Sequence, residues 1–254
     1  MKPWIRKTVL SSLISLWLFN LPVHALSIYT EESPPGSFIT PDGKLSGISV
    51  EIVRMIQKEL GDISPIQLVL WKDGYYKLET QPDTMLFSTT RTPEREKLFH
   101  WVGPLFEVQW LLIAQKSAGL KINSLEDAKK LTKIGTYHDD AREKFLIRSG
   151  FKNLYSVKKA KQLPMLLHRG RIDAFVSTNL GVSNIWSKFY FAKNPSDIFE
   201  TIFTFKTYSL YMAFSKTTNP KIINNWQRAF DKLLKQGEIK QIRDKWFNKT
   251  TRPD

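Results

Sequence analysis

The sequence predicts an α/β fold with mostly parallel sheets. Short apolar runs of strand length alternate along the chain with segments whose apolar residues recur every three or four positions, the helical period. This alternation is typical of parallel sheets covered by helices, because two parallel strands need a long crossover between them. The 254 residues, of which 42% are hydrophobic and 13% aromatic, suffice to bury the core of such a fold.

The first 25 residues have the pattern of a secretory signal peptide. Three basic residues precede an uncharged, mostly apolar run at 9–21, and Val23-His24-Ala25 loosely fits a small-x-small cleavage site. The alternative is an N-terminal membrane anchor, but the run is shorter than the roughly 20 residues that a spanning helix needs. We therefore predict cleavage after Ala25 and export to the periplasm.

The first half of the mature chain is expected to contain three strands and a helix. Strands are predicted at 26–30, 66–70 and 84–88, where apolar residues of strand length occur. Between the first two, residues 48–60 place apolar side chains on one helical face, and Gly61 is expected to end that helix.

The second half continues the alternation. Further strands are predicted at 111–114, 133–137, 172–177 and 208–215. The helices between and after them are expected to begin at polar capping residues, because side-chain oxygens accept hydrogen bonds from the free N–H groups of a first turn. These capping residues are Ser124 with Asp127, either Asp139 or Asp140, and Asn219 before Pro220.

Composition excludes several classes of protein. The absence of cysteine excludes a disulfide scaffold, a cysteine zinc site, a thiol nucleophile and a lipid-modified N-terminal cysteine. The signal peptide removes three of the 38 Lys and Arg residues and none of the 24 Asp and Glu residues, so the net charge falls from +14 to +11. The remaining basic residues are spread over predicted helix faces, which argues against a nucleic-acid partner. The histidines have no metal-ligand spacing, so no metal or cofactor is predicted.

Five segments, in order, carry a resemblance to a known family. They read YTEESPP at 29–35, DGKLSGISVE at 42–51, STTRTPERE at 88–96, GRIDA at 170–174 and GEIKQIRDKWF at 237–247. Together, behind a signal peptide, they resemble the bacterial extracellular solute-binding proteins of family 3, which include amino-acid-binding components of ABC importers. The segment at 88–96 is the most specific of the five.

The resemblance implies a two-lobed periplasmic binding protein type II fold, with two mixed, mostly parallel sheets flanked by helices and joined by a hinge of two crossovers. Lobe 1 would comprise 26–108 and 206–254, and lobe 2 would comprise 109–205. The crossings would lie near 107–110 and 201–207. The implied protein is a monomer that binds a small polar, carboxylate-bearing ligand between its lobes and closes around it.

The implied role is ABC-type uptake, with an inner-membrane permease as the partner. Two alternatives remain. The same cleft would serve a sensory module that signals to a membrane receptor. A few relatives of this fold are dehydratases, and His138 beside Asp139 and Asp140 could supply a base with its orienting acid. The motifs of common hydrolases and nucleotide-binding enzymes are absent from the sequence, so we predict a binding protein and not an enzyme.

The resemblance also implies a set of ligand-binding residues. Arg95 occupies the position of the arginine that grips the ligand carboxylate, for which a planar guanidinium with parallel N–H donors is suited. Ser88 and Thr90 would offer hydroxyls and backbone amides to the same carboxylate. Trp71 would form an aromatic wall, and Phe38 would replace the aromatic residue of the first loop.

Two departures from the family pattern bear on the other end of the ligand. Asp139 and Asp140 stand where hydroxyl residues usually complete the carboxylate site, so they would either cap a helix or accept a ligand ammonium. Thr178 stands where amino-acid binders present an aspartate to the α-ammonium, and a hydroxyl cannot neutralise a buried cation. The sequence therefore leaves open whether the ligand carries an α-ammonium, and modified amino acids, other carboxylates and short peptides fit as well.

Overall fold

The computed structural model describes residues 26–181 and 197–250, so the predicted signal peptide lies outside the described residues. Eight strands form one mixed sheet in the order β4-β1-β5-β10-β6-β9-β7-β8. Their bounds are β1 (Ser27–Thr30), β4 (Ile66–Leu68), β5 (Thr84–Thr90), β6 (His100–Gln115), β7 (Ile134–Tyr137), β8 (Leu154–Val157), β9 (Ala174–Thr178) and β10 (Phe199–Phe214). A separate antiparallel pair is formed by β2 (Phe38–Ile39) and β3 (Leu45–Ser46).

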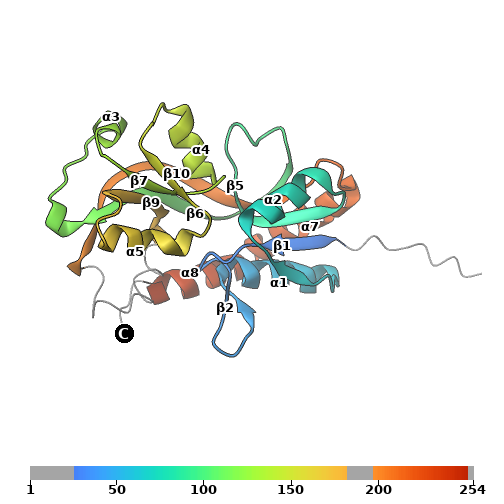
Figure 1. Cartoon of the computed structure of the whole chain (residues 1–254). Coiled ribbons are helices and arrows are strands. Elements are labelled where there is room, and N and C mark those ends of the chain that lie inside the picture. Colours follow the sequence, from blue (N-terminus) through green and yellow to red (C-terminus); the bar gives the residue numbers. More distant parts are fainter. Residues whose placement is uncertain (1–25, 182–196, 251–254) are drawn as a thin grey trace, which may run out of the picture.

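Helices follow most of the strands, as the α/β prediction requires. Their bounds are α1 (Ile48–Leu60), α2 (Trp71–Thr80), α3 (Leu125–Lys129), α4 (Ala141–Arg148), α5 (Leu163–His168), α7 (Pro220–Lys235) and α8 (Glu238–Thr250), with short 3₁₀ turns η1 (Lys116–Ala118) and η2 (Ala160–Gln162). Figure 1 shows β7, α4 and α5 in one half of the molecule and β1, α1 and α2 in the other. The predicted α/β architecture is confirmed.

The two longest strands, β6 and β10, link the halves. They pair antiparallel from Phe199 opposite Gln115 to Phe214 opposite His100, with three shifts of register. The parallel strands β5, β1 and β4 continue the sheet on one side, and β9, β7 and β8 continue it on the other. The structure therefore has one continuous sheet where two sheets were predicted. The two predicted lobe crossings lie inside the unbroken strands β6 and β10. The lobe boundaries stay a prediction.

Capping residues end and begin the helices largely where the sequence indicates. Gly61 follows α1 in the left-handed conformation (φ 65°), and its N–H reaches the carbonyls of Gln57 and Lys58. Ser124 caps α3, Asp140 caps α4 and Asn219 caps α7, each by accepting a backbone N–H on its side-chain oxygen. Of the two aspartates proposed for α4, the structure therefore selects Asp140.

Helix α2 was not predicted from the sequence. It begins without a side-chain cap at Leu70 and contains Gly74, both of which weaken the sequence signal. The glycine is explained by packing, because a Cβ there would lie 3.0 Å from side-chain atoms of Leu86 and Val69. The close approach seats α2 against β5 and brings Trp71 to the interior.

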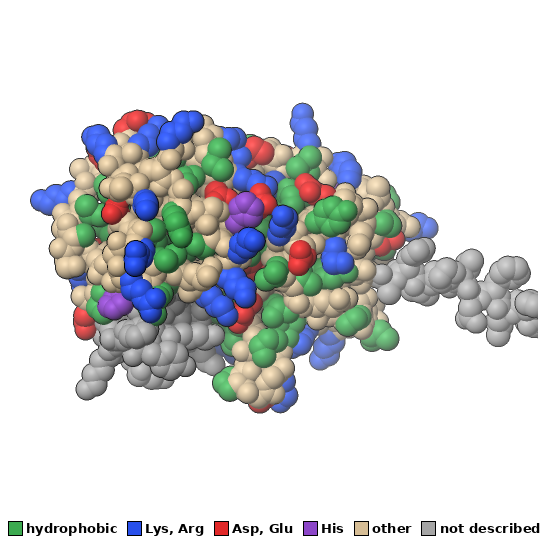
Figure 2. All heavy atoms as spheres, viewed as in Figure 1, with side chains coloured by type: hydrophobic (Ala, Val, Ile, Leu, Met, Phe, Trp, Pro, Cys, Tyr) green, Lys and Arg blue, Asp and Glu red, His purple; other side chains and the backbone are tan. Residues whose placement is uncertain are grey.

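Charged side chains cover the surface without forming one stripe. Figure 2 shows Lys and Arg side chains spread over the visible face with Asp and Glu between them. Within residues 26–181 and 197–250, no helix has the length and apolar content that crossing a bilayer requires.

The largest core cluster lies where α1, α7 and α8 pack against the sheet. Trp226 of α7 is 2% exposed and meets the buried ring of Phe214 edge-on at 5.9 Å between centroids.

We expect Trp226→Ala to lower the free energy of unfolding by about 3–5 kcal/mol, because it removes a buried ring and leaves a cavity. Urea denaturation measures this change. The 64% exposed Tyr76 provides the control. A loss from Tyr76→Ala as large as that from Trp226→Ala would contradict the packing argument.

Candidate functional site

A pocket of about 80 Å³ lies between the two halves of the molecule. Its walls come from the loop after β1, the end of β5, the first residue of α2, the start of α4 and the end of β9, and the middle of β6 and β10 forms its floor. The polar lining residues are Glu31, Ser33, Ser88, Thr90, Arg95, Asp140, Arg142 and Thr178, and the aromatic ones are Trp71, Phe87, Phe106 and Trp110.

Arg95 is the buried cation of this pocket. It lies in the turn after β5, is 5% exposed, and one of its terminal nitrogens, Nη1, donates to the Thr90 carbonyl at 3.3 Å. Its guanidinium carbon lies 5.1 Å from the Trp71 ring centroid and 4.9 Å from that of Tyr75. The other terminal nitrogen, Nη2, is buried and has no hydrogen-bond partner among the described residues. A buried donor without a partner is costly, so this atom favours an anionic ligand.

Ser88 and Thr90, at the end of β5, both line the pocket beside Arg95. Ser88 has a left-handed backbone (φ 60°), which is uncommon for a residue other than glycine. Its hydroxyl donates to the Ser49 hydroxyl at 2.7 Å in the first turn of α1. Backbone conformations of this kind cluster at ligand sites, where the surrounding structure must hold them.

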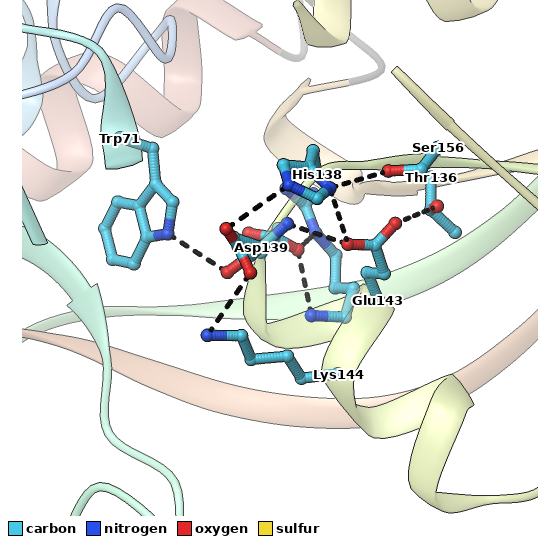
Figure 3. A network of polar contacts seen from close by, with 9 residues as sticks. Trp71, Thr136, His138, Asp139, Glu143, Lys144 and Ser156 are labelled. Atoms are coloured by element: carbon cyan, nitrogen blue, oxygen red, sulfur yellow. Dashed lines mark hydrogen bonds and ion pairs between the residues drawn. The ribbon is translucent and has the colours of Figure 1, made fainter. Parts of the chain in front are cut away.

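Only one of the two predicted aromatic residues lines the pocket. Trp71 lines the pocket and is buried, and its indole N–H donates to the Asp139 carbonyl at 3.3 Å (Figure 3). Phe38 is not a lining residue. It lies in β2 with its ring edge-on to Trp246 at 5.9 Å. The sequence offered no means to see that Phe38 packs against Trp246 of α8.

Likewise, only one of the two aspartates before α4 lines the pocket. The Asp140 side chain lines the pocket and accepts hydrogen bonds from the Arg142 backbone N–H at 2.8 Å and from Arg142 Nε at 2.6 Å. Burial acts to raise the pKa of Asp140, but the Arg142 charge and these hydrogen bonds outweigh it and hold the pKa below its ordinary value. The Asp139 carboxylate lies outside the lining, near His138 and Lys144.

Thr178 lines the pocket from the end of β9, but its hydroxyl is already engaged. It accepts the Gly181 backbone N–H at 2.9 Å. The hydroxyl therefore closes a local turn, and because it is neutral it cannot replace a carboxylate against a buried ammonium.

Two charged residues of the pocket were not among the predicted site residues. Glu31 follows β1 within the first matching segment, and Arg142 lies two residues after Asp140. Burial raises the pKa of Glu31 to about 8, the Asp140 charge adds to the rise, and Arg142 opposes it. The acidic pair Glu31-Glu32 next to a turn was the available sequence signal, but only the fold selects the first of the two.

These charges give the pocket a preference for anions. Asp140 neutralises Arg142, and Glu31 is mostly protonated at neutral pH because of its raised pKa. Arg95 then contributes an excess positive charge that the walls do not balance. In the described part of the chain, no cluster of three His, Cys, Asp or Glu residues is arranged to hold a metal ion.

The raised pKa of Glu31 predicts a pH dependence of stability. Its ordinary pKa of 4.5 in the unfolded chain rises to about 8 on folding, so the folded state binds the proton more tightly between these values. We expect the free energy of unfolding to fall as pH rises from about 5 to 8, and Glu31→Gln to flatten this slope. Urea denaturation at several pH values measures both. An unchanged slope in Glu31→Gln would show that Glu31 is not the group responsible.

Comparison with known proteins gives a match over most of the chain. The model of the bacterial extracellular solute-binding proteins, family 3, matches residues 26–249. The "Probable amino-acid ABC transporter-binding protein" of Haemophilus influenzae is 26% identical over 220 residues, which cover 84% of this chain and 80% of that protein.

Solved structures show the same fold. A histidine kinase sensor domain with similarity to periplasmic binding proteins superposes with a TM-score of 0.77 and 20% identity, covering 87% of this chain and 96% of that one. An ancestral arginine-binding protein bound to arginine gives a TM-score of 0.75 and 23% identity, covering 88% and 98%. Because neither is 25% identical to this chain, the likeness carries the fold alone.

Proposed function

Since the chain belongs to the bacterial extracellular solute-binding proteins of family 3, we propose that it captures a small amino-acid-like ligand through the ligand's carboxylate and hands it to an ABC-type permease. The observation that carries this proposal is Arg95, which lines the pocket, is buried, and has a terminal nitrogen, Nη2, without a hydrogen-bond partner among the described residues. The name of the Haemophilus relative agrees with it.

The surroundings of Arg95 hold its guanidinium in place before a carboxylate binds. The Trp71 and Tyr75 rings lie within about 5 Å of the guanidinium and restrict its rotation, and the Thr90 carbonyl holds one terminal nitrogen. Little side-chain entropy remains to be lost when a ligand binds, so more of the interaction appears as affinity. The hydroxyls of Ser88 and Thr90 lie in the same wall.

The opposite end of the ligand meets Glu31. The other candidates are less suited: Asp140 is already paired with Arg142 through Oδ1, the Thr178 hydroxyl is neutral and accepts the Gly181 N–H, and the Asp139 carboxylate is not a lining group. Among the described residues, none forms a hydrogen bond with the Glu31 side chain that would compete with a ligand. A ligand ammonium would pair with Glu31 and ionise it, whereas a ligand without an ammonium would leave Glu31 protonated.

Contacts across the cleft support capture by closure. The Trp71 indole reaches the Asp139 carbonyl, and Glu94 beside Arg95 forms an ion pair of 2.8 Å with Arg148 of α4. The strands β6 and β10 cross between the halves and provide the pivot. This geometry is that of a hinged cleft in which the ligand lies under both lobes.

The periplasm is the compartment that the proposal requires, and the predicted signal peptide would direct the protein there. A sensory role at a membrane receptor is the second candidate, and the histidine kinase sensor domain of the same fold favours it. The dehydratase-like alternative has less support. The His138 side chain is 48% exposed and does not line the pocket, so we propose binding without chemistry.

Arg95→Ala tests the carboxylate site. A thermal-shift screen of the mature protein against amino acids, polyamines, organic acids and short peptides would identify the ligand through its stabilisation, about 2.7 kcal/mol at 100 times Kd. We expect Arg95→Ala to weaken binding by about 100-fold, because a charged donor pair is lost from a buried site. Calorimetry gives the affinity. The control is Arg91→Ala, because Arg91 pairs with the exposed Glu96. Equal affinity in Arg95→Ala and the wild type would refute the assignment.

Glu31→Gln tests the other end of the ligand. For an α-amino acid, binding at pH 7 should release about one proton from Glu31, because the carboxyl must ionise to pair with the ammonium. Calorimetry in two buffers of different ionisation enthalpy measures the release, which Glu31→Gln should abolish together with most of the affinity. Binding of an α-amino acid that persists in Glu31→Gln would place its ammonium elsewhere.

A further inference from the structure

A buried carboxylate holds the turn between β7 and α4, and this turn faces the cleft. Glu143, in the first turn of α4, is 5% exposed. Its Oε1 accepts the Thr136 hydroxyl at 2.7 Å, and its Oε2 accepts the Asp139 backbone N–H at 2.7 Å (Figure 3). Glu143 thus ties the end of β7 to the residue that approaches Trp71.

Asp139 needs this support because its backbone is left-handed. Its φ of 60° is unfavourable for a residue with a Cβ. The hydrogen bond from its N–H to the Glu143 carboxylate is short, 2.7 Å, and carboxylate oxygens are strong acceptors. With the N–H turned toward Glu143, the carbonyl of Asp139 points to the other half of the molecule, where it accepts the Trp71 indole N–H at 3.3 Å.

The surroundings of Glu143 reinforce the same turn. His138 Nδ1 lies 3.1 Å from the Ser156 hydroxyl and 3.7 Å from Glu143 Oε2, and its Nε2 lies 3.4 Å from the Asp139 carboxylate. Lys144 Nζ lies 3.7 Å from the Asp139 carboxylate and 5.4 Å from the Tyr75 ring centroid. Figure 3 shows these side chains converging on Asp139 from one side, with Trp71 on the other.

We propose that Glu143 is a positioning residue for closure of the cleft: it fixes the conformation of Asp139 so that the Asp139 carbonyl latches onto Trp71 across the cleft. This inference rests on the proposed capture by closure and adds the device that stabilises the closed state. The Glu94–Arg148 ion pair is a weaker second contact, because both side chains are nearly half exposed and screened by solvent.

The latch is testable without a ligand. Because the chain contains no cysteine, Lys72→Cys and Lys152→Cys, both at exposed positions and one in each half, can carry two nitroxide labels. Electron–electron distance measurements then give the ratio of closed to open molecules. We expect Glu143→Gln to lower this ratio about five-fold, since a neutral amide oxygen is a weaker acceptor for the Asp139 N–H than a carboxylate oxygen.

Trp71→Phe provides the second variant, because it keeps an aromatic ring in the wall and deletes the indole N–H together with the five-membered part of the ring system. It should lower the same ratio about as much, and Glu143→Gln added to it should change the ratio less than two-fold, because both act through one hydrogen bond. The matched control is Glu126→Gln, which removes an exposed carboxylate of α3 that pairs with Lys129 and should leave the ratio unchanged.

Independent, multiplying effects of Glu143→Gln and Trp71→Phe would overturn the proposal, as would an unaltered ratio in either single variant. A purely structural role for Glu143 would lower the free energy of unfolding without shifting the distance distribution. Failure of the ligand screen or of Arg95→Ala would instead concern the proposed carboxylate site, since the distances are measured on the empty protein.

Discussion

The antiparallel pairing of β6 and β10 is the constraint on which the rest of the structure depends. These strands are the middle of the eight-stranded sheet, so both halves are built outward from the same ladder. Arg95 lies in the segment that enters β6, and Thr178 ends the strand that pairs with β6 on the other side. Side chains of β6 form the pocket floor. A disturbance of this pairing would therefore displace both walls of the site together.

The pocket concentrates buried charge, and each charge is handled differently. Asp140 and Arg142 neutralise one another within a single helix turn, Glu31 is held mostly protonated by burial, and Arg95 is packed between aromatic rings with one nitrogen left for a ligand. Isolated buried charges are destabilising. The arrangement keeps that cost low at the Asp140–Arg142 pair and at Glu31, and it leaves an unpaired hydrogen-bond donor at Arg95, where a ligand can accept it.

Local sequence signals predicted the parts of the fold that depend on neighbouring residues. The boundary of α1 at Gly61 and the caps of α3, α4 and α7 follow from backbone hydrogen bonding within a few residues. Helix α2 was missed because its stability comes from packing against β5, which Gly74 permits. In the site, Arg95, Ser88 and Thr90 share one segment and were placed together, whereas Phe38 was misplaced because its ring packs against α8.

The sequence by itself determined the α/β class, the family pattern and the candidate carboxylate anchor, because each of these is written in short segments. The tertiary structure decided which charges meet. Glu31, after β1, and Asp140, before α4, are more than 100 residues apart in the sequence, yet they line one pocket. It also decided that Asp140 faces the pocket while the carbonyl of Asp139 faces Trp71. Adjacent residues with the same side chain acquire different roles only when the backbone conformation and the opposite lobe are fixed.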